Sequence, residues 1–479
     1  MMRAALQRAW LASLVPAERR YRWALKHPEA AQLGLLRRAC KSGGAYSDDH
    51  RLHTIDSLGA WQSKVPIVDY DTLAPYLERA RAGERTALSR DPITLFERSG
   101  GSTGTTTKLI PYNAGLLADF AAATGPWLAQ MYRRFALVGT RAYWSLSPVV
   151  QGAKVTDGGV PIGMADDTEY FGPVRRFVLA KTMAVDPSVM HAPDFVTWRR
   201  VTLDQLLAAD DLGFISVWSP TFLTVLLDGL RPRWPRLRLV SCWTDGPAAA
   251  QLAALSDILP GVPIQPKGLL ATEGVVSLPY GDGPGTALAL TSHLLEMIDL
   301  AHPERRPLLP HELRVGGEYS PLLTTRGGLV RYHLKDIVRC VAPLRIQFVG
   351  KLDQISDQVG EKIHARQVEL ALASSRHTFV LLAPVMVDGR ASYCLYLEGA
   401  DDPDAVARAL DVHLMSGHAY RYARELGQLG PLRVAVVHDG RERALRALIE
   451  AGQRAGDIKP SLLDSRSIWS SIFGIGRAV

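Results

Sequence analysis

Residues 96–112 read Phe-Glu-Arg-Ser-Gly-Gly-Ser-Thr-Gly-Thr-Thr-Thr-Lys-Leu-Ile-Pro-Tyr, with glycines, hydroxyl side chains and one lysine between two short apolar segments. Glycine lets backbone N–H groups curve around an anion, hydroxyls add donors, and lysine supplies positive charge. This composition is typical of a phosphate-binding loop, with a plain surface turn as the alternative. The common Gly-Lys-Ser/Thr pattern is excluded, because Lys108 lies between Thr107 and Leu109.

The composition is that of a soluble globular protein. At 479 residues the chain is long enough for two or three domains and a large buried core. Hydrophobic residues make up 47% and charged residues 22%, which are ordinary values. The formal charge of +7 is spread along the chain without a basic stripe interleaved with aromatics. We therefore expect small anionic substrates and no nucleic-acid partner.

The cysteines and the N-terminus indicate an intracellular protein. Cys40, Cys242, Cys340 and Cys394 lie far apart, with no spacing that suggests a zinc site or a disulfide framework. Leu11–Val15 is too short for a signal-peptide core, and no apolar stretch reaches the roughly 18 residues of a membrane span. We expect a cytoplasmic chain with no membrane association.

In the first third of the chain, helices are predicted both before and after the glycine loop and its flanking strands. Periodic Ala, Leu and Arg residues predict helices over residues 1–60, and a polar helix is expected over Tyr76–Ala82. Ile93–Arg98 is predicted as the strand that enters the loop. After the loop, Asn113 can cap a long helix, Ala114–Phe135.

The middle of the chain alternates short β-rich runs with helical ones, which predicts βαβ units and a largely parallel or mixed sheet. The strands are expected at Ala142–Ser147, Gly213–Trp218 and Leu237–Trp243, and the helices at Thr221–Leu230 and Ala248–Leu259. A second, smaller unit is expected after about residue 350. Its elements are a helix near Arg366–Ser374, strands at Phe379–Val387 and Ser392–Glu398, and helices at Pro403–Ser416 and Arg441–Ala451.

Other motifs accompany the loop in a fixed order along nearly the whole chain. They are Ala24–Gln32, Val65–Arg79, Lys154–Gly163, Ala271–Gly274, Thr324–Asp336, Phe348–Ile355 and Ala455–Pro460. With the loop they resemble the adenylate-forming enzymes. Among these, the chain is similar to the acyl acid–amido synthetases first known from auxin-responsive plant genes (the Gretchen Hagen type), and it looks like a bacterial-type member.

The resemblance implies an α/β enzyme with two parts. A large N-terminal domain, residues 1–350, would carry mixed β-sheets flanked by helices and the ATP and acyl sites. A smaller mobile α+β domain, residues 351–479, would follow a hinge at Lys351–Asp353. Such an enzyme is a ligase that uses Mg²⁺ and ATP to turn a carboxylic acid into an acyl-adenylate. It then transfers the acyl group to an amine, most simply an amino acid, and we expect a monomer.

The resemblance also assigns the phosphate loop. Ser102, Thr103 and Gly104 would cradle the β- and γ-phosphates, with Ser99 at the start of the loop. Lys108 would act as a point charge nearby, because phosphoryl-group chemistry depends mainly on positioning and charge neutralisation. A solvated lysine at a strand end is the alternative for Lys108.

Five later residues complete the implied site. Glu273 would act in catalysis by holding Mg²⁺, which favours one or two carboxylates with phosphate oxygens and water, and Thr272 would donate to the α-phosphate. Asp336 would accept both ribose hydroxyls. Arg331 would reach the phosphates or the nucleotide, or would only brace Asp336. Lys459, from the second domain, would stabilise the charge that develops during adenylation. The alternatives are an exposed loop glutamate, a turn aspartate and a tail lysine.

Aromatic and polar residues elsewhere give weaker indications. Trp144, Trp218 and Trp243 could line an acyl pocket or could simply be core residues. His293 and Glu296 fall where the family carries a Glu-bearing strand near the nucleotide.

The sequence departs from the family pattern in ways that keep alternatives open. Gly100 replaces a serine and Thr105 stands near an expected glycine, so the register of the loop is open by one residue. His333 and Lys335 stand where Arg and Gly are usual. A ligase that uses coenzyme A or a carrier-protein thiol as acceptor, and a catalytically silent family member, are therefore the alternative functions.

Overall fold

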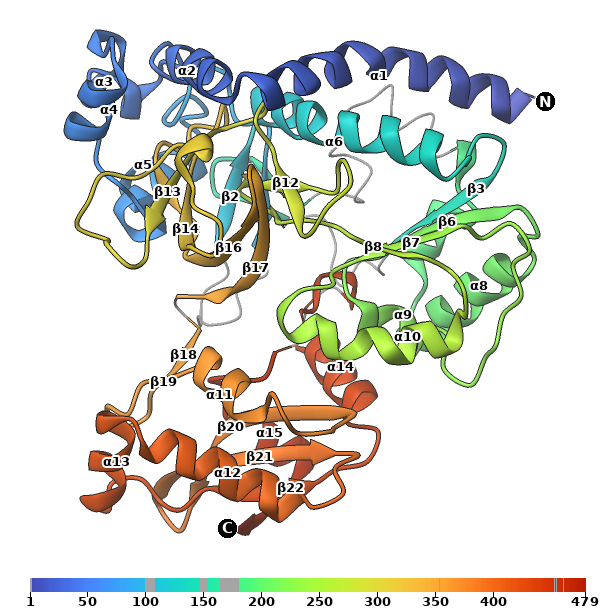
Figure 1. Cartoon of the computed structure of the whole chain (residues 1–479), viewed down its shortest axis with the longest axis vertical. Helices are drawn as coiled ribbons and strands as arrows, with labels where there is room; N and C mark the ends of the chain where they lie inside the picture. The colour runs from blue at the N-terminus through green and yellow to red at the C-terminus, as the bar shows by residue number, and fades with distance from the viewer. Residues whose placement is uncertain are drawn as a thin grey trace.

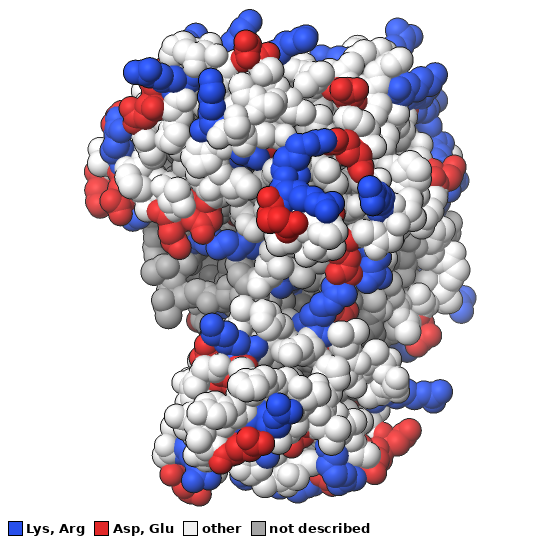
Figure 2. Space-filling view, turned by 60° about the vertical axis from the view of Figure 1, so that its left-hand side comes forward, with Lys and Arg blue, Asp and Glu red and all other residues white. Residues whose placement is uncertain are grey.

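The computed structural model describes residues 2–99, 108–146, 154–163, 181–352, 354–451, 453, 455–459 and 461–479. A large part built from the first three quarters of the chain stands above a smaller C-terminal part (Figure 1). Figure 2 shows the constriction between them, with basic and acidic side chains interspersed over this face. No helix among the described residues has the length and apolarity that a membrane crossing requires.

Helices form the N-terminal region, as predicted. They are α1 (Met2–Lys26), α2 (Pro28–Ala39), α3 (Ala45–Asp49), α4 (Leu58–Lys64) and α5 (Tyr70–Arg81). The helix predicted at Tyr76–Ala82 begins earlier because Asp69 caps it, its Oδ1 accepting the Thr72 N–H at 3.1 Å.

The glycine loop (residues 99–108) joins two antiparallel strands, β1 (Leu95–Arg98) and β2 (Leu109–Tyr112). The Ser99 N–H donates to the Lys108 carbonyl at 3.0 Å and closes the base of the loop. Asn113 caps the helix that follows, as predicted, since its Oδ1 accepts the Leu116 N–H at 2.8 Å. This helix is α6 (Ala114–Arg134), and two short strands, β4 (Lys154–Val155) and β5 (Pro161–Ile162), complete the sheet.

The alternating middle region forms the predicted parallel sheet. Its strands, in spatial and chain order, are β3 (Arg141–Trp144), β6 (Leu212–Ser216), β7 (Leu239–Cys242) and β8 (Ile264–Pro266). The connections carry α8 (Phe195–Leu207), α9 (Pro220–Leu226) and α10 (Leu252–Ile258). Parallel strands need such crossovers, and β6 and β7 are buried throughout.

An antiparallel sheet follows, in the order β11-β12-β17-β16-β14-β13, with β15 paired to β14. Its strands are β11 (Ser277–Leu278), β12 (Thr286–Leu288), β13 (Leu294–Asp299), β14 (Glu318–Thr324), β15 (Tyr332–His333), β16 (Asp336–Ala342) and β17 (Arg345–Lys351). The register of β16 with β17 places Asp336 opposite Lys351.

The C-terminal part is an α+β unit around the four-stranded sheet β20-β21-β22-β23. Its elements are β18 (Ile355–Ser356), β19 (Ile363–His364), α11 (Ala365–Leu372), β20 (Phe379–Val387), β21 (Arg390–Glu398), α12 (Pro403–Met415), α13 (His418–Glu425), β22 (Arg433–Val436), α14 (Gly440–Glu450), α15 (Trp469–Phe473) and β23 (Arg477–Ala478). Asp388 and Gly389, with φ of +50° and +76°, make the tight turn between β20 and β21. Alternate residues of these strands enter two separate hydrophobic clusters, so both faces of the sheet are covered.

One large hydrophobic cluster fills the part before Lys351, and Ala455 also belongs to it. The α/β class with mixed sheets and a smaller α+β part agrees with the expectation. The boundary at residue 350 and the mobility of the second part stay predictions.

Candidate active site

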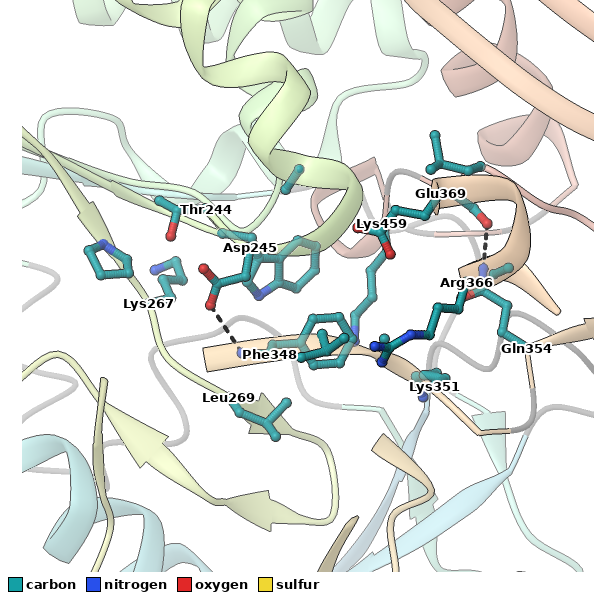
Figure 3. Close-up of a pocket in the computed structure, with 18 of the residues that line it drawn as sticks. Thr244, Asp245, Lys267, Leu269, Phe348, Lys351, Gln354, Arg366, Glu369 and Lys459 are labelled. Atoms are coloured by element: carbon teal, nitrogen blue, oxygen red, sulfur yellow. Dashed lines mark hydrogen bonds between the residues drawn. The ribbon is translucent and has the colours of Figure 1, made fainter. Parts of the chain in front are cut away.

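A pocket of about 110 Å³ lies where the two parts of the chain meet. Segments that follow β7 and β8 form one wall, the end of β17 forms another, and α11 with the C-terminal tail closes it. Figure 3 shows Asp245, Lys267 and Leu269 on the side of the large part and Arg366 and Lys459 facing them.

A tight hairpin beside this pocket presents Thr272 and Glu273. The hairpin consists of β9 (Leu270–Ala271) and β10 (Gly274–Val275), so these two residues form its turn. The hydroxyl of Tyr112, at the end of β2, donates to the Thr272 carbonyl at 2.5 Å. This bond ties the hairpin to the strand that leaves the glycine loop.

Four charged side chains gather around the hairpin: Lys108, Glu273, Asp336 and Lys351, which we call the carboxylate–lysine cluster. Burial raises the pKa of the Glu273 carboxyl, and the negative charge of Asp336 adds to this, while Lys351 and Lys108 oppose it. Lys351 Nζ lies 3.5 Å from Asp336 Oδ1, and Asp336 is 4% exposed. Lys351 also lines the pocket, so the cluster adjoins it.

The cluster combines two kinds of chemistry. Two carboxylates close together are hard oxygen ligands for a cation such as Mg²⁺. The lysines are mobile positive charges that suit phosphate oxygens. Among the described residues, no group of three or more His, Cys, Asp or Glu side chains forms a metal site.

Lys459 enters the pocket from the C-terminal tail. Its Nζ lies 5.1 Å from the centroid of the Trp243 ring, which in turn is 5.8 Å from the Trp218 ring. Across the pocket, burial raises the pKa of the Asp245 carboxyl, although that carboxylate accepts the Phe348 N–H at 3.3 Å.

An ion pair joins the two parts at this point. The Arg366 guanidinium, at the start of α11, donates to both carboxylate oxygens of Glu318 on β14, each at 2.9 Å. Arg339 donates to the same carboxylate at 2.8 Å. The observed arrangement of the parts is thus held partly by charge.

A buried lysine lies among tryptophans in the wall of the pocket. Lys267 is 4% exposed, and its Nζ donates to Ser216 Oγ at 2.6 Å. The same Nζ lies 4.8 Å from the Trp218 ring centroid, 5.6 Å from Trp127 and 5.9 Å from Trp144. Cation–π attraction stabilises such a charge at low exposure.

Arg331 lies in a buried network away from the pocket lining. Its Nε and Nη2 donate to the Glu296 carboxylate at 3.0 and 3.1 Å, and its Nη1 donates to the Val65 and Gln62 carbonyls at 2.6 and 3.2 Å. The Trp61 indole also donates to Glu296, at 3.0 Å. These contacts give Arg331 a structural role, but its partner is Glu296 and not Asp336, the residue that it was expected to brace.

The structure therefore brings several of the predicted site residues together. Lys108, Glu273 and Asp336 share one cluster, with Thr272 on the same hairpin. Ser99 lies at the base of the glycine loop. Ser102, Thr103 and Gly104 lie outside the described residues, as does Asp353 of the expected hinge.

Other residues of the site could not be predicted from the sequence. The register of β17 brings Lys351 to the pocket, and the turns after β7 and β8 bring Asp245 and Lys267 there, so no sequence motif marks these three as site residues. His293 lies elsewhere, with its Nδ1 3.5 Å from Asp119 Oδ2.

Family comparisons agree with this geometry. The GH3 family N-terminal domain matches residues 18–237, its central domain residues 286–351, and its C-terminal domain residues 358–466. The chain belongs to the GH3 family. This membership confirms the predicted family and the prediction of an ATP-using ligase.

Curated and solved relatives extend over most of the chain. The chain is 21% identical, over 514 aligned positions, to the indole-3-acetic acid-amido synthetase GH3.10 of Arabidopsis thaliana, covering 82% of this chain and 83% of that protein. The solved structure of the GH3.15 acyl acid amido synthetase matches with a TM-score of 0.74 at 15% identity, covering 94% of each chain. A 2-hydroxyisobutyryl-CoA ligase in its postadenylation state matches with a TM-score of 0.55 at 12% identity, covering 93% of this chain and 91% of the other. The predicted adenylate-forming fold is thereby confirmed.

Proposed function

We propose that this GH3-family chain activates a carboxylic acid with Mg–ATP as an acyl-adenylate and then transfers the acyl group to an amine, most simply an amino acid. The carboxylate–lysine cluster beside the pocket carries the proposal. It contains a carboxylate that would suit a hard cation, lysines that would suit phosphates and a buried aspartate that could accept from a ribose.

In the first step, an oxygen of the acid's carboxylate attacks the α-phosphorus of ATP. A phosphorus–oxygen bond forms there while the bond to the leaving pyrophosphate breaks. Lys108 and Lys351 offset the negative charge brought together, and Asp336 fixes the nucleoside by accepting from its ribose hydroxyls. We assign the phosphate cradle to the glycine loop, with Ser102, Thr103 and Gly104.

Glu273 is the residue proposed to hold Mg²⁺. Its pKa is raised by burial and by the nearby Asp336, so its charged form is unfavourable until a cation is close. When bound, Mg²⁺ supplies positive charge to the phosphate oxygens. Thr272, at the same turn, would donate to the α-phosphate.

The acid itself is proposed to lie against Trp218 and Trp243, near Lys267. Trp218 and Trp243 offer flat apolar surface for the acid's hydrocarbon, and Lys267 offers positive charge beside the Trp218 ring. The GH3.15 acyl acid amido synthetase in complex with 2,4-DB has the same fold, with a TM-score of 0.74 at 16% identity, and the match covers 94% of this chain and 93% of that one.

In the second step, the amine nitrogen attacks the acyl carbonyl, the bond to AMP breaks and the amine loses a proton. Lys459 would first stabilise adenylation. Rotation of the part after residue 350, with release of the Arg366–Glu318 ion pair, would then open the site to the amine. The amido-synthetase names of the GH3 relatives support an amine over a thiol.

Product analysis by mass spectrometry tests this function directly. The protein is incubated with Mg–ATP, a panel of carboxylic acids, and amino acids and coenzyme A side by side. We expect AMP, pyrophosphate and an N-acyl amino acid. Thioester without amide would make the chain a coenzyme A ligase, and neither product with any acid would indicate a silent family member.

A further inference from the structure

A second cavity, of about 450 Å³, lies in the large part between α2, the segment before β1, and the end of β14. Figure 1 places α2 at the end of the large part that faces away from the C-terminal part. Among the described residues, none lines both this cavity and the pocket between the two parts. The cavity is therefore separate from the site proposed for catalysis.

Positive charge is in excess around this cavity. Of the described residues, those with basic side chains in its lining are Arg37, Arg38, Lys41, Arg90 and Arg326. The acidic ones are Asp91 and Asp119. Five positive charges against two negative charges leave an excess of three.

The buried Asp119, one of the two negative charges, is shared between two arginines. It is 1% exposed, and its Oδ1 lies 2.7 Å from Arg326 Nη2 and 3.5 Å from Arg38 Nη2. Burial opposes ionisation of this carboxyl, but His293, Arg326 and Arg38 together hold its pKa below the ordinary value. Asp119 thus aligns two guanidinium groups and leaves part of their charge for a further anion.

A buried asparagine fixes the frame of the cavity. Asn113 Nδ2 donates to Ser89 Oγ at 2.9 Å, to the Asp91 carbonyl at 3.2 Å and to the Arg326 carbonyl at 3.0 Å. A side chain at Gly115 could not fit, since its Cβ would lie 2.8 Å from Arg326 Cβ. The segments that carry Arg90 and Arg326 are therefore held in place without a ligand.

One polar atom of the lining lacks a partner within the described part of the chain. Thr325 is 5% exposed and its Oγ1 makes no hydrogen bond there. A buried hydroxyl without a partner is unfavourable, and this one lies within the wall of the cavity.

We propose that this cavity binds a small phosphoryl anion that carries several negative charges. Planar guanidinium groups from Arg37, Arg38 and Arg90 can share the oxygens of such a group, with Lys41 as an added point charge. The excess of positive charge favours pyrophosphate over singly charged anions. The site is independent of the proposed ligase reaction and stands if that proposal fails.

Residue-resolved modification of arginines by phenylglyoxal, read by mass spectrometry, tests this site in the intact chain. Magnesium is left out, and pyrophosphate, inorganic phosphate, citrate and sodium chloride are compared at equal ionic strength. Saturating pyrophosphate should slow modification of Arg37, Arg38 and Arg90 about tenfold. At lower concentrations, the degree of protection should follow the fraction of cavities that hold pyrophosphate. Exposed Arg19 and Arg20 on α1 should be unaffected.

Two matched double variants complete the test. In Arg37→Gln/Lys41→Gln, the pyrophosphate concentration that half-protects Arg90 should rise about tenfold. In Arg19→Gln/Arg20→Gln, which removes the same charge from the surface, it should not change. Arg37 and Lys41 are exposed, so the fold should be kept, and circular dichroism checks this. Absence of protection, equal protection by sodium chloride, or equal protection by citrate would each overturn the proposal.

Discussion

Replacing Arg331 with methionine tests whether this residue supports the fold or binds the nucleotide. Arg331 is 2% exposed and Glu296 is 1% exposed, and two hydrogen bonds join them at 3.0 and 3.1 Å. Removing one partner of a buried ion pair costs about 3–5 kcal/mol. Glu296 keeps its bonds from Trp61 and Gln62, so we expect the lower end, about 3 kcal/mol.

Urea unfolding followed by tryptophan fluorescence measures this loss. Arg8→Met, at an exposed arginine of α1, serves as the matched control and should leave the free energy of unfolding unchanged. With Glu296→Gln, a double-mutant cycle should give a coupling free energy of about 2 kcal/mol between Arg331 and Glu296.

Nucleotide binding supplies the opposing readout. At a temperature where Arg331→Met stays folded, calorimetry should give the same affinity for ATP as the parent chain. The structural role is refuted if unfolding is unchanged while ATP binding weakens by tenfold or more, about 1.4 kcal/mol.

The remaining predictions concern the proposed ligase site. Burial raises the pKa of Glu273 in the folded state above its ordinary 4.5. The folded state therefore loses stability as pH rises from the pKa of Glu273 in the unfolded chain to its higher pKa in the folded state. At neutral pH, Glu273→Gln should therefore unfold at a higher temperature than the parent, the gain should vanish below about pH 4, and adenylation should slow about a hundredfold. If the parent chain were as stable as the variant at neutral pH, burial would not be disfavouring the charged form of Glu273. Asp336→Asn should raise the KM for ATP about tenfold or more in steady-state assays, because hydrogen bonds to a charged acceptor are lost. An unchanged KM would remove Asp336 from the ribose. Lys459→Ala should slow single-turnover formation of the acyl-adenylate about tenfold to a hundredfold, while transfer from a supplied acyl-adenylate stays the same. Equal slowing of both steps would argue against its role in adenylation. Lys267→Met should weaken binding of the acid about tenfold without changing that of ATP, and a shift in ATP binding instead would move Lys267 out of the acid pocket.

Local chemistry made much of the fold predictable. The cap at Asn113 and the two strands that flank the glycine loop are set by neighbours in sequence, so their positions could be read from the residues. The parallel sheet followed from the alternation of short apolar runs with helices. Helix α5 begins before the predicted Tyr76, because its N-terminal cap is Asp69.

Site residues could be predicted from the sequence only where they belong to a recognisable motif. Glu273 and Asp336 were found from family-like motifs, but their neighbour Lys351 depends on the pairing of β16 with β17, and strand register is set by tertiary packing. The same holds for Arg331, whose partner Glu296 belongs to another strand. Lys267 looked like an ordinary lysine, because only the fold surrounds it with tryptophans.

Carboxylate-dependent exchange between radiolabelled pyrophosphate and ATP tests the central claim most directly, because it reports adenylation without any acceptor. With the acid that the protein uses, from a panel of aromatic and aliphatic acids, label should enter ATP only when acid and Mg²⁺ are both present, and Glu273→Gln should slow the exchange about a hundredfold. Exchange with none of the acids, together with no binding of ATP in calorimetry, would contradict the claim that this chain is an adenylating enzyme.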